Sequence, residues 1–179
     1  MISFLLLLVL VWGFYIGYRR GLLLQVYYLI SAMASAFMAG QFYKGLGEQF
    51  HLLLPYANSQ EGQGTFFFPS DQLFQLDKVF YAGIGYLLVF GIVYSIGRLL
   101  GLLLHLIPSK KLGGKLFQVS AGILSMLVTL FVLQMALTIL ATIPMENPLE
   151  KSIVAKHIIQ SIPITTSWLK QIWVTNLIG

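Results

Sequence analysis

The chain contains no cysteine among its 179 residues. This absence excludes a disulfide framework, a thiolate metal site and a cysteine nucleophile. Charge is also scarce, since charged residues make up only 9% of the chain while hydrophobic residues make up 58%. Soluble domains carry about 25% charged residues, and disordered chains have low hydrophobicity. The composition, with a mean hydropathy of +0.83, therefore indicates a polytopic membrane protein.

Carboxylates are missing from the long apolar runs, because all six acidic residues lie outside them. Ion-coupled carriers typically place carboxylates or histidines inside their spans. The sequence also has no P-loop, no H-E-x-x-H, no G-x-S-x-G and no glycine-rich dinucleotide turn. His51, His105 and His157 share no local ligand spacing. We therefore expect neither an ion-coupled carrier nor an enzyme, and we predict no catalytic residue, no cofactor and no metal site.

What the chain does have is a series of apolar runs long enough for membrane-spanning helices, which need about 20 residues each. Four runs predict an all-α polytopic membrane protein with spans at about 2–18, 22–42, 79–104 and 116–143. Arg19, Arg20 and Gly21 are the only residues between the first two spans, so these helices must form a tight antiparallel hairpin. Residues 1–143 thus form the predicted transmembrane domain, with a long outer loop at 43–78.

The remaining residues, 144–179, predict a C-terminal tail of amphipathic, interfacial helices. Asn147 followed by Pro148 favours a helix start, and this helix is expected to end before Pro163. A second short helix carrying Trp168 and Trp173 is expected at the membrane interface, where indole rings prefer to lie. A fifth span is disfavoured by three lysines, Lys151, Lys156 and Lys170.

Basic residues in the short loops predict the orientation of the helices. The Arg19–Arg20 turn and the 110–115 loop, which contains three lysines, fall on the same side if all four runs span the membrane. We therefore predict that this side is cytoplasmic and that both termini and the long loop are outside. Because the eleven basic residues are scattered and partly mark membrane edges, the net charge of +5 does not indicate a nucleic-acid partner.

Small residues recur at helical spacing, as in Gly13-x3-Gly17 and Gly97-x3-Gly101, and Gly122 belongs to a stripe of small residues on the fourth span. Such residues let the backbones of neighbouring helices approach closely. Two interpretations follow. The glycines either pack helices within one subunit, or they line a path or an interface between copies of the chain.

Gln134 and Arg98 are polar side chains within the apolar runs that call for an explanation. Gln134 lies in the fourth span and needs a hydrogen-bond partner there, either from a neighbouring helix or from a polar pathway. Arg98 lies in the third apolar run, where it either extends to the predicted cytoplasmic interface or forms a functional charge pair. Both residues are candidate intramembrane polar sites.

The order of these features resembles the colicin V production protein family, CvpA-like membrane proteins of bacteria. The resemblance rests on the Gly17–Gly21 turn, with sequence Gly-Tyr-Arg-Arg-Gly, and on Gly113–Phe117 running into Ser120–Gly122. The tail from Ser152–Lys156 to Pro163 is also similar to members from Gram-positive bacteria. The resemblance implies an integral membrane protein linked to colicin V or toxin production or secretion and to envelope homeostasis. It implies no catalytic residue.

These observations leave two hypotheses for function. The first is a non-enzymatic accessory protein of the bacterial cytoplasmic membrane, with membrane lipids and an envelope or secretion protein as partners. The second is a small channel or transporter formed by homo-oligomers around the third and fourth spans.

Overall fold

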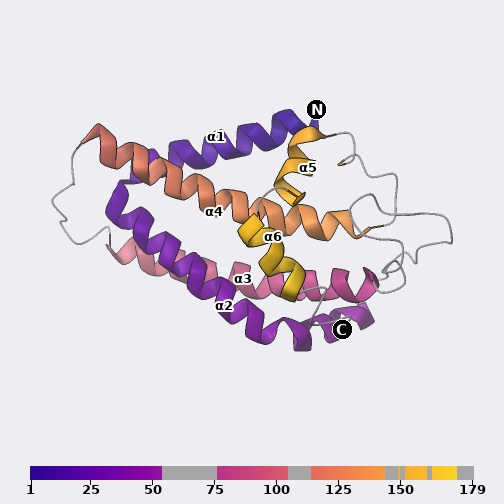
Figure 1. The fold of residues 1–179 in the computed structure, drawn as a ribbon. Coiled ribbons are helices and arrows are strands. Elements are labelled where there is room, and N and C mark those ends of the chain that lie inside the picture. The colour runs from indigo at the N-terminus through magenta and orange to yellow at the C-terminus, as the bar shows by residue number, and fades with distance from the viewer. Residues whose placement is uncertain (54–75, 105–113, 144–148, 150–151, 161–162, 173–179) are drawn as a thin grey trace.

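A computed structural model describes residues 1–53, 76–104, 114–143, 149, 152–160 and 163–172. Figure 1 shows four long helices and two short ones. The long helices are α1 (Ile2–Arg20), α2 (Leu22–Leu53), α3 (Leu76–Leu104) and α4 (Lys115–Ala141). The short helices are α5 (Ile153–Gln160) and α6 (Pro163–Lys170). The described part of the chain contains no strand, and the protein is an all-α membrane protein with four helices long and apolar enough to span a bilayer.

The long helices form where the sequence has uninterrupted apolar runs. All six prolines, at positions 55, 69, 108, 144, 148 and 163, lie outside these four helices. Each helix therefore satisfies its backbone hydrogen bonds internally, as a segment surrounded by lipid must. Between α1 and α2, Gly21 adopts φ 91° and ψ 160°, a backbone conformation essentially restricted to glycine. This single residue makes the hairpin turn that the sequence predicted.

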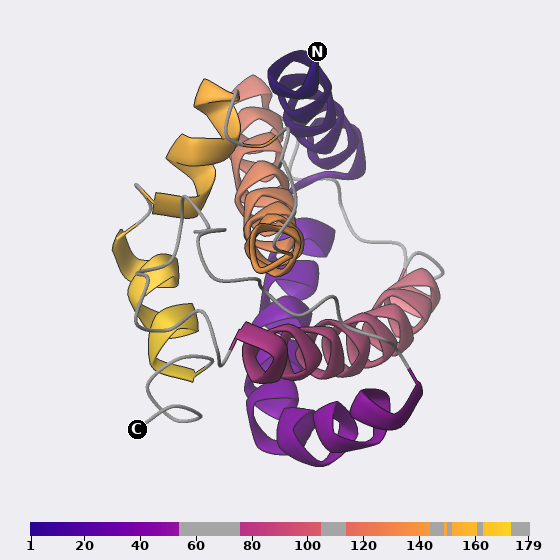
Figure 2. The same ribbon diagram turned by 90° about the vertical axis from the view of Figure 1, so that its right-hand side faces the viewer.

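The four long helices pack as two pairs. α2 packs most extensively against α3, and α1 packs against α4. Contacts between α2 and α4 connect the two pairs. Viewed from the end of the bundle in Figure 2, α1 and α4 lie together above α2 and α3. Much of the outer surface is apolar, for example Phe4 at 73% and Val11 at 67% exposure on α1. Large apolar side chains exposed to this extent are typical of a surface that contacts lipid rather than water.

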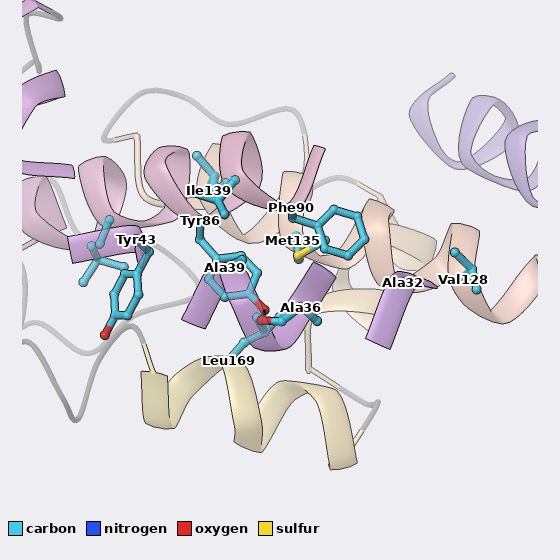
Figure 3. Close-up of a cluster of buried hydrophobic side chains, with 13 residues drawn as sticks. Ala32, Ala36, Ala39, Tyr43, Tyr86, Phe90, Val128, Met135, Ile139 and Leu169 are labelled. Atoms are coloured by element: carbon cyan, nitrogen blue, oxygen red, sulfur yellow. Dashed lines mark hydrogen bonds between the residues drawn. The ribbon is translucent and has the colours of Figure 1, made fainter. Parts of the chain in front are cut away.

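The core lies where α2, α3 and α4 meet α6 (Figure 3). Tyr86 and Phe90 of α3 are buried, and the Tyr86 hydroxyl donates a hydrogen bond of 2.7 Å to the carbonyl of Ala36 on α2. The side of α2 that faces these rings carries small side chains, which allow the rings to pack close to its backbone. These residues are Ala32, Ala36 and Ala39. Leu169 of α6 completes the cluster and points toward Tyr86 and Ala36 in Figure 3.

The boundaries of α2 and α3 differ from the sequence prediction. α2 does not end at Phe42 but continues to Leu53, so the first eleven residues of the predicted outer loop are helical. The reason is tertiary packing, because Tyr43 is buried and the backbone of Gly47 lies against Tyr81 and Ala82 of α3. α3 correspondingly begins at Leu76, and the predicted loop residues 54–75 lie outside the described residues.

The tail contains both of the short helices that the sequence predicted. The cap at Asn147 and Pro148 lies outside the described residues; α5 begins after Ser152, whose Oγ accepts a hydrogen bond of 3.2 Å from the Ala155 amide. The Ser152 hydroxyl also contacts that of Ser3 at 2.8 Å, which joins the start of α5 to the start of α1. α6 begins at Pro163. Figures 1 and 2 show both helices along one side of the bundle, next to α4. The interfacial position of the tail stays a prediction.

Candidate functional site

Two arginines from different helices meet around one tyrosine at the end of the bundle where α1 ends and α2 begins. The Arg20 Cζ atom lies 5.1 Å from the ring centroid of Tyr28, and the Arg98 Cζ atom lies 5.9 Å from the same centroid. Arg98 also lies 6.0 Å from the ring centroid of Tyr94. Guanidinium groups are attracted to aromatic faces at such distances. We call Arg20, Arg98, Tyr28 and Tyr94 the arginine–tyrosine cluster.

Close contact between α2 and α3 builds this cluster. The Tyr28 ring lies against Gly101, where a Cβ atom would be 2.5 Å from its Cε1 atom. The neighbouring Tyr27 hydroxyl donates a hydrogen bond of 3.1 Å to the Gly97 carbonyl, and a Cβ at Gly97 would collide with Ser31. Gly97 and Gly101 therefore bring α3 close enough to α2 for Arg98 to reach Tyr28.

Two other basic residues described at this end, Arg19 and Lys115, are exposed. Arg19 is exposed and follows the apolar part of α1, and Lys115 is exposed at the start of α4. Arg20 is partly buried beside Tyr28, so the two arginines of the turn occupy different environments. Gly21, the third residue of the predicted turn motif, has open space around its Cα. Its role is the backbone conformation described above.

A second glycine-rich contact joins α1 to α4. A Cβ at Gly13 would lie 2.5 Å from the Thr129 Oγ1 atom, and one at Gly17 would collide with the Ala121 carbonyl. From the α4 side, a Cβ at Gly122 would lie 2.6 Å from the Phe14 ring. The candidate glycines Gly97, Gly101 and Gly122 thus all lie in helix contacts within one copy of the chain.

Gln134 is buried in α4 at 1% exposure. Its Oε1 accepts a hydrogen bond from the hydroxyl of Thr165 on α6, a partner that the sequence did not identify. The nearby hydroxyls of Thr138 and Thr142 instead donate to carbonyls of their own helix, those of Gln134 and Ile139. Gln134, Thr138 and Thr142 therefore form hydrogen bonds with the backbone around the end of α4 and with α6.

Two features of the site escaped the sequence analysis. Gln25 of α2 is buried at 2% exposure, and its Oε1 has no hydrogen-bond partner within the described part of the chain. Trp168 of α6 packs edge-on against Tyr86, with 6.1 Å between the ring centroids, and in a tilted arrangement against Phe131, with 6.0 Å between the ring centroids. The polarity of Gln25 inside an apolar run was a usable signal for the first. No sequence signal indicated the packing of Trp168, because a tryptophan at the membrane interface and one that faces the core look alike in sequence.

The arginine, glutamine and threonine side chains described above can bind anions and form hydrogen bonds between helices. Cationic guanidinium groups attract anions, and buried amides and hydroxyls orient helices. Within the described ranges, no three histidine, aspartate or glutamate side chains gather in a metal-binding arrangement.

Comparison with known proteins agrees with this fold. A family model described as Colicin V production protein matches residues 2–163. An uncharacterized transmembrane protein of Bacillus subtilis (strain 168), YshB, is 26% identical over 176 residues, which is 97% of each chain. No solved structure matches the chain. The match confirms the resemblance seen in the sequence and covers all four long helices. The chain therefore belongs to the Colicin V production protein family, as an integral membrane protein of that family.

Proposed function

We propose that the protein is a non-enzymatic accessory protein of the bacterial cytoplasmic membrane. It supports toxin production or secretion, and envelope homeostasis, through contacts with partner proteins and lipids. The family description, which names the production of the toxin colicin V, supports the biological setting. The bacterial relative supports the assignment to a bacterial membrane. The basic end of the bundle faces the cytoplasm in this proposal, because basic residues concentrate in cytoplasmic loops.

The packed interior of the bundle is the observation that carries this proposal. Phe14 and Thr129 fill the space at the α1–α4 contact, and Tyr86, Phe90 and Met135 belong to the buried cluster formed by α2, α3, α4 and α6. In this proposal, other molecules contact the outer surface of the described helices rather than a path through one copy. α1 has the most open surface of the long helices, and its Trp12 and Tyr15 are 61% and 53% exposed.

The first test is genetic. Deleting the gene in its native host is expected to lower secretion of exported proteins or tolerance to envelope stress, and the wild-type chain should restore both. Gly17→Leu should fail to restore them, because its side chain would collide with the α4 backbone at Ala121. Gly40→Ala is the matched control, since nothing lies within 4 Å of a Cβ at that position. A deletion strain that is unchanged in secretion and in envelope tolerance would contradict the proposal.

The second test identifies what contacts the outer surface. A photo-crosslinking residue at Trp12 should attach the chain to a protein of different mass, whereas the same residue at buried Tyr86 should not. The alternative hypothesis of an oligomeric channel or transporter makes the opposite prediction. It requires a ladder of multiples of the 20.0 kDa chain and solute flux into proteoliposomes containing the purified protein. That result would replace the accessory role by a pore.

A further inference from the structure

The arginine–tyrosine cluster places two positive charges around one ring. Arg20 ends α1, Arg98 belongs to α3, and their Cζ atoms lie 5.1 Å and 5.9 Å from the ring centroid of Tyr28. Neither side chain forms an ion pair or a hydrogen bond with any residue in the described ranges. Two positive charges around one ring are stabilised by an anion that accepts hydrogen bonds from both.

No acidic residue in the described ranges supplies that anion. The two acidic residues within the described ranges, Glu48 and Asp77, lie near the end of α2 and at the start of α3. Those positions are at the opposite end of the bundle from Arg20 and Arg98, as the course of α2 and α3 in Figure 1 shows.

We propose that the arginine–tyrosine cluster binds the phosphate group of an anionic phospholipid. The planar guanidinium groups of Arg20 and Arg98 donate hydrogen bonds to the phosphate oxygens, a geometry for which arginine is well suited. Tyr28 and Tyr94 hold the guanidinium planes in place through their ring faces. Basic pockets between membrane helices commonly bind such head groups.

The surroundings favour a lipid over a free phosphate ion. Leu99 and Leu102, which follow Arg98 on α3, are 64% and 59% exposed, and Leu23 on α2 is 63% exposed. These apolar side chains offer a surface for acyl chains next to the charged cluster. These leucine side chains would not contribute to the binding of an inorganic phosphate ion, which has no acyl chain. The cluster also ends the apolar run of α1, where lipid head groups lie.

Native mass spectrometry of the purified full chain in detergent tests this site. The chain is mixed in turn with phosphatidylglycerol, with zwitterionic phosphatidylcholine and with inorganic phosphate. Wild type should retain phosphatidylglycerol in preference to phosphatidylcholine, and inorganic phosphate should not displace it. Arg98→Gln and Arg20→Gln should each weaken retention about fivefold, and the double variant about 25-fold.

Arg19→Gln is the matched control, because it removes one exposed charge next to Arg20 and leaves the cluster intact. It should retain lipid like wild type. Arg98 is itself exposed, so Arg98→Gln keeps the test valid even if Arg20→Gln does not fold. Equal weakening by Arg19→Gln would overturn the proposal in favour of a general surface-charge effect. Displacement by inorganic phosphate, or unchanged retention in Arg98→Gln, would overturn it as well. The site does not depend on the proposed accessory role.

Discussion

Two buried glutamines show how much a single polar side chain depends on its neighbours. Gln134 has a partner in Thr165, whereas the Oε1 of Gln25 has none within the described part of the chain. A hydrogen bond between membrane helices contributes about 1 kcal/mol, and a buried acceptor without a partner costs a similar amount or more. The same residue type is therefore expected to stabilise the fold at one position and to destabilise it at the other.

Substituting each glutamine by methionine, which has a similar shape, tests this difference. Gln134→Met should lower the free energy of unfolding by about 1 kcal/mol, because the Thr165 hydroxyl loses its acceptor. Gln25→Met should leave it unchanged or raise it by up to about 1 kcal/mol. Unfolding in mixed micelles by titration with a denaturing detergent measures both. If Gln25→Met lowered the free energy of unfolding more than Gln134→Met did, Gln25 would have to form a hydrogen bond that the structure does not show.

At the scale of helices, α1 depends on its contact with α4. Gly17→Ala places a methyl group against the Ala121 carbonyl, which is backbone and cannot rotate away. Overpacking of this kind costs about 1–3 kcal/mol. Gly40→Ala adds the same methyl group to α2 in open space and should not destabilise the protein. Thermal unfolding of the two variants in detergent should therefore separate them, and equal melting temperatures would argue against the tight α1–α4 contact.

The docking of α6 is a second prediction at this scale. Trp168→Ala removes the ring contacts with Tyr86 and Phe131, each typically contributing about 0.5–1.5 kcal/mol. α6 should then leave the bundle more often, which exposes Leu169, a residue only 3% exposed in the intact fold. Because the chain has no cysteine, a single Leu169→Cys reports this opening through its rate of maleimide labelling.

The labelling rate of Leu169→Cys should rise when Trp168→Ala is added. Adding Trp12→Ala instead removes an exposed tryptophan of α1 and should leave the rate unchanged. Equal rates in all three proteins would mean that Trp168 does not hold α6 on the bundle.

At the scale of the whole molecule, the distribution of charge predicts the orientation in the membrane. Lys115 is exposed at the basic end of the bundle, and Ile153 is 82% exposed at the start of α5, near the opposite end. With both termini outside, a membrane-impermeant maleimide on intact cells or spheroplasts should label Ile153→Cys and not Lys115→Cys. Permeabilised cells should label both variants, which controls for expression. The reverse labelling pattern would invert the topology.

The sequence predicted the four long helices because apolar runs of sufficient length must become helices in lipid, whatever surrounds them. Gly21 likewise marked the α1–α2 turn, since the break between the two runs is local. The end of α2 was not predictable in this way. Residues after Phe42 are mixed in polarity, and they remain helical because Tyr43 and Gly47 pack on α3.

The candidate site shows the same division. Arg98 and Gln134 stood out in the sequence because charged and amide side chains are rare within apolar runs, and Arg20 stood out because it lies in the turn between two such runs. Their neighbours did not stand out. That Arg20 and Arg98 share Tyr28, that Gln134 meets Thr165, and that Trp168 faces the core all depend on contacts between helices distant in sequence.

The sequence by itself thus determined the class of the protein, the location of its spans and the concentration of basic residues in two of its turns, because each depends on local hydropathy and charge. Only the tertiary structure decided which helices pair and which side of each helix is buried. In lipid, apolar side chains gain little by turning away from their surroundings, so hydropathy does not specify how a helix is rotated. Close contacts at Gly17 and Gly101, together with a few hydrogen bonds, specify that rotation instead.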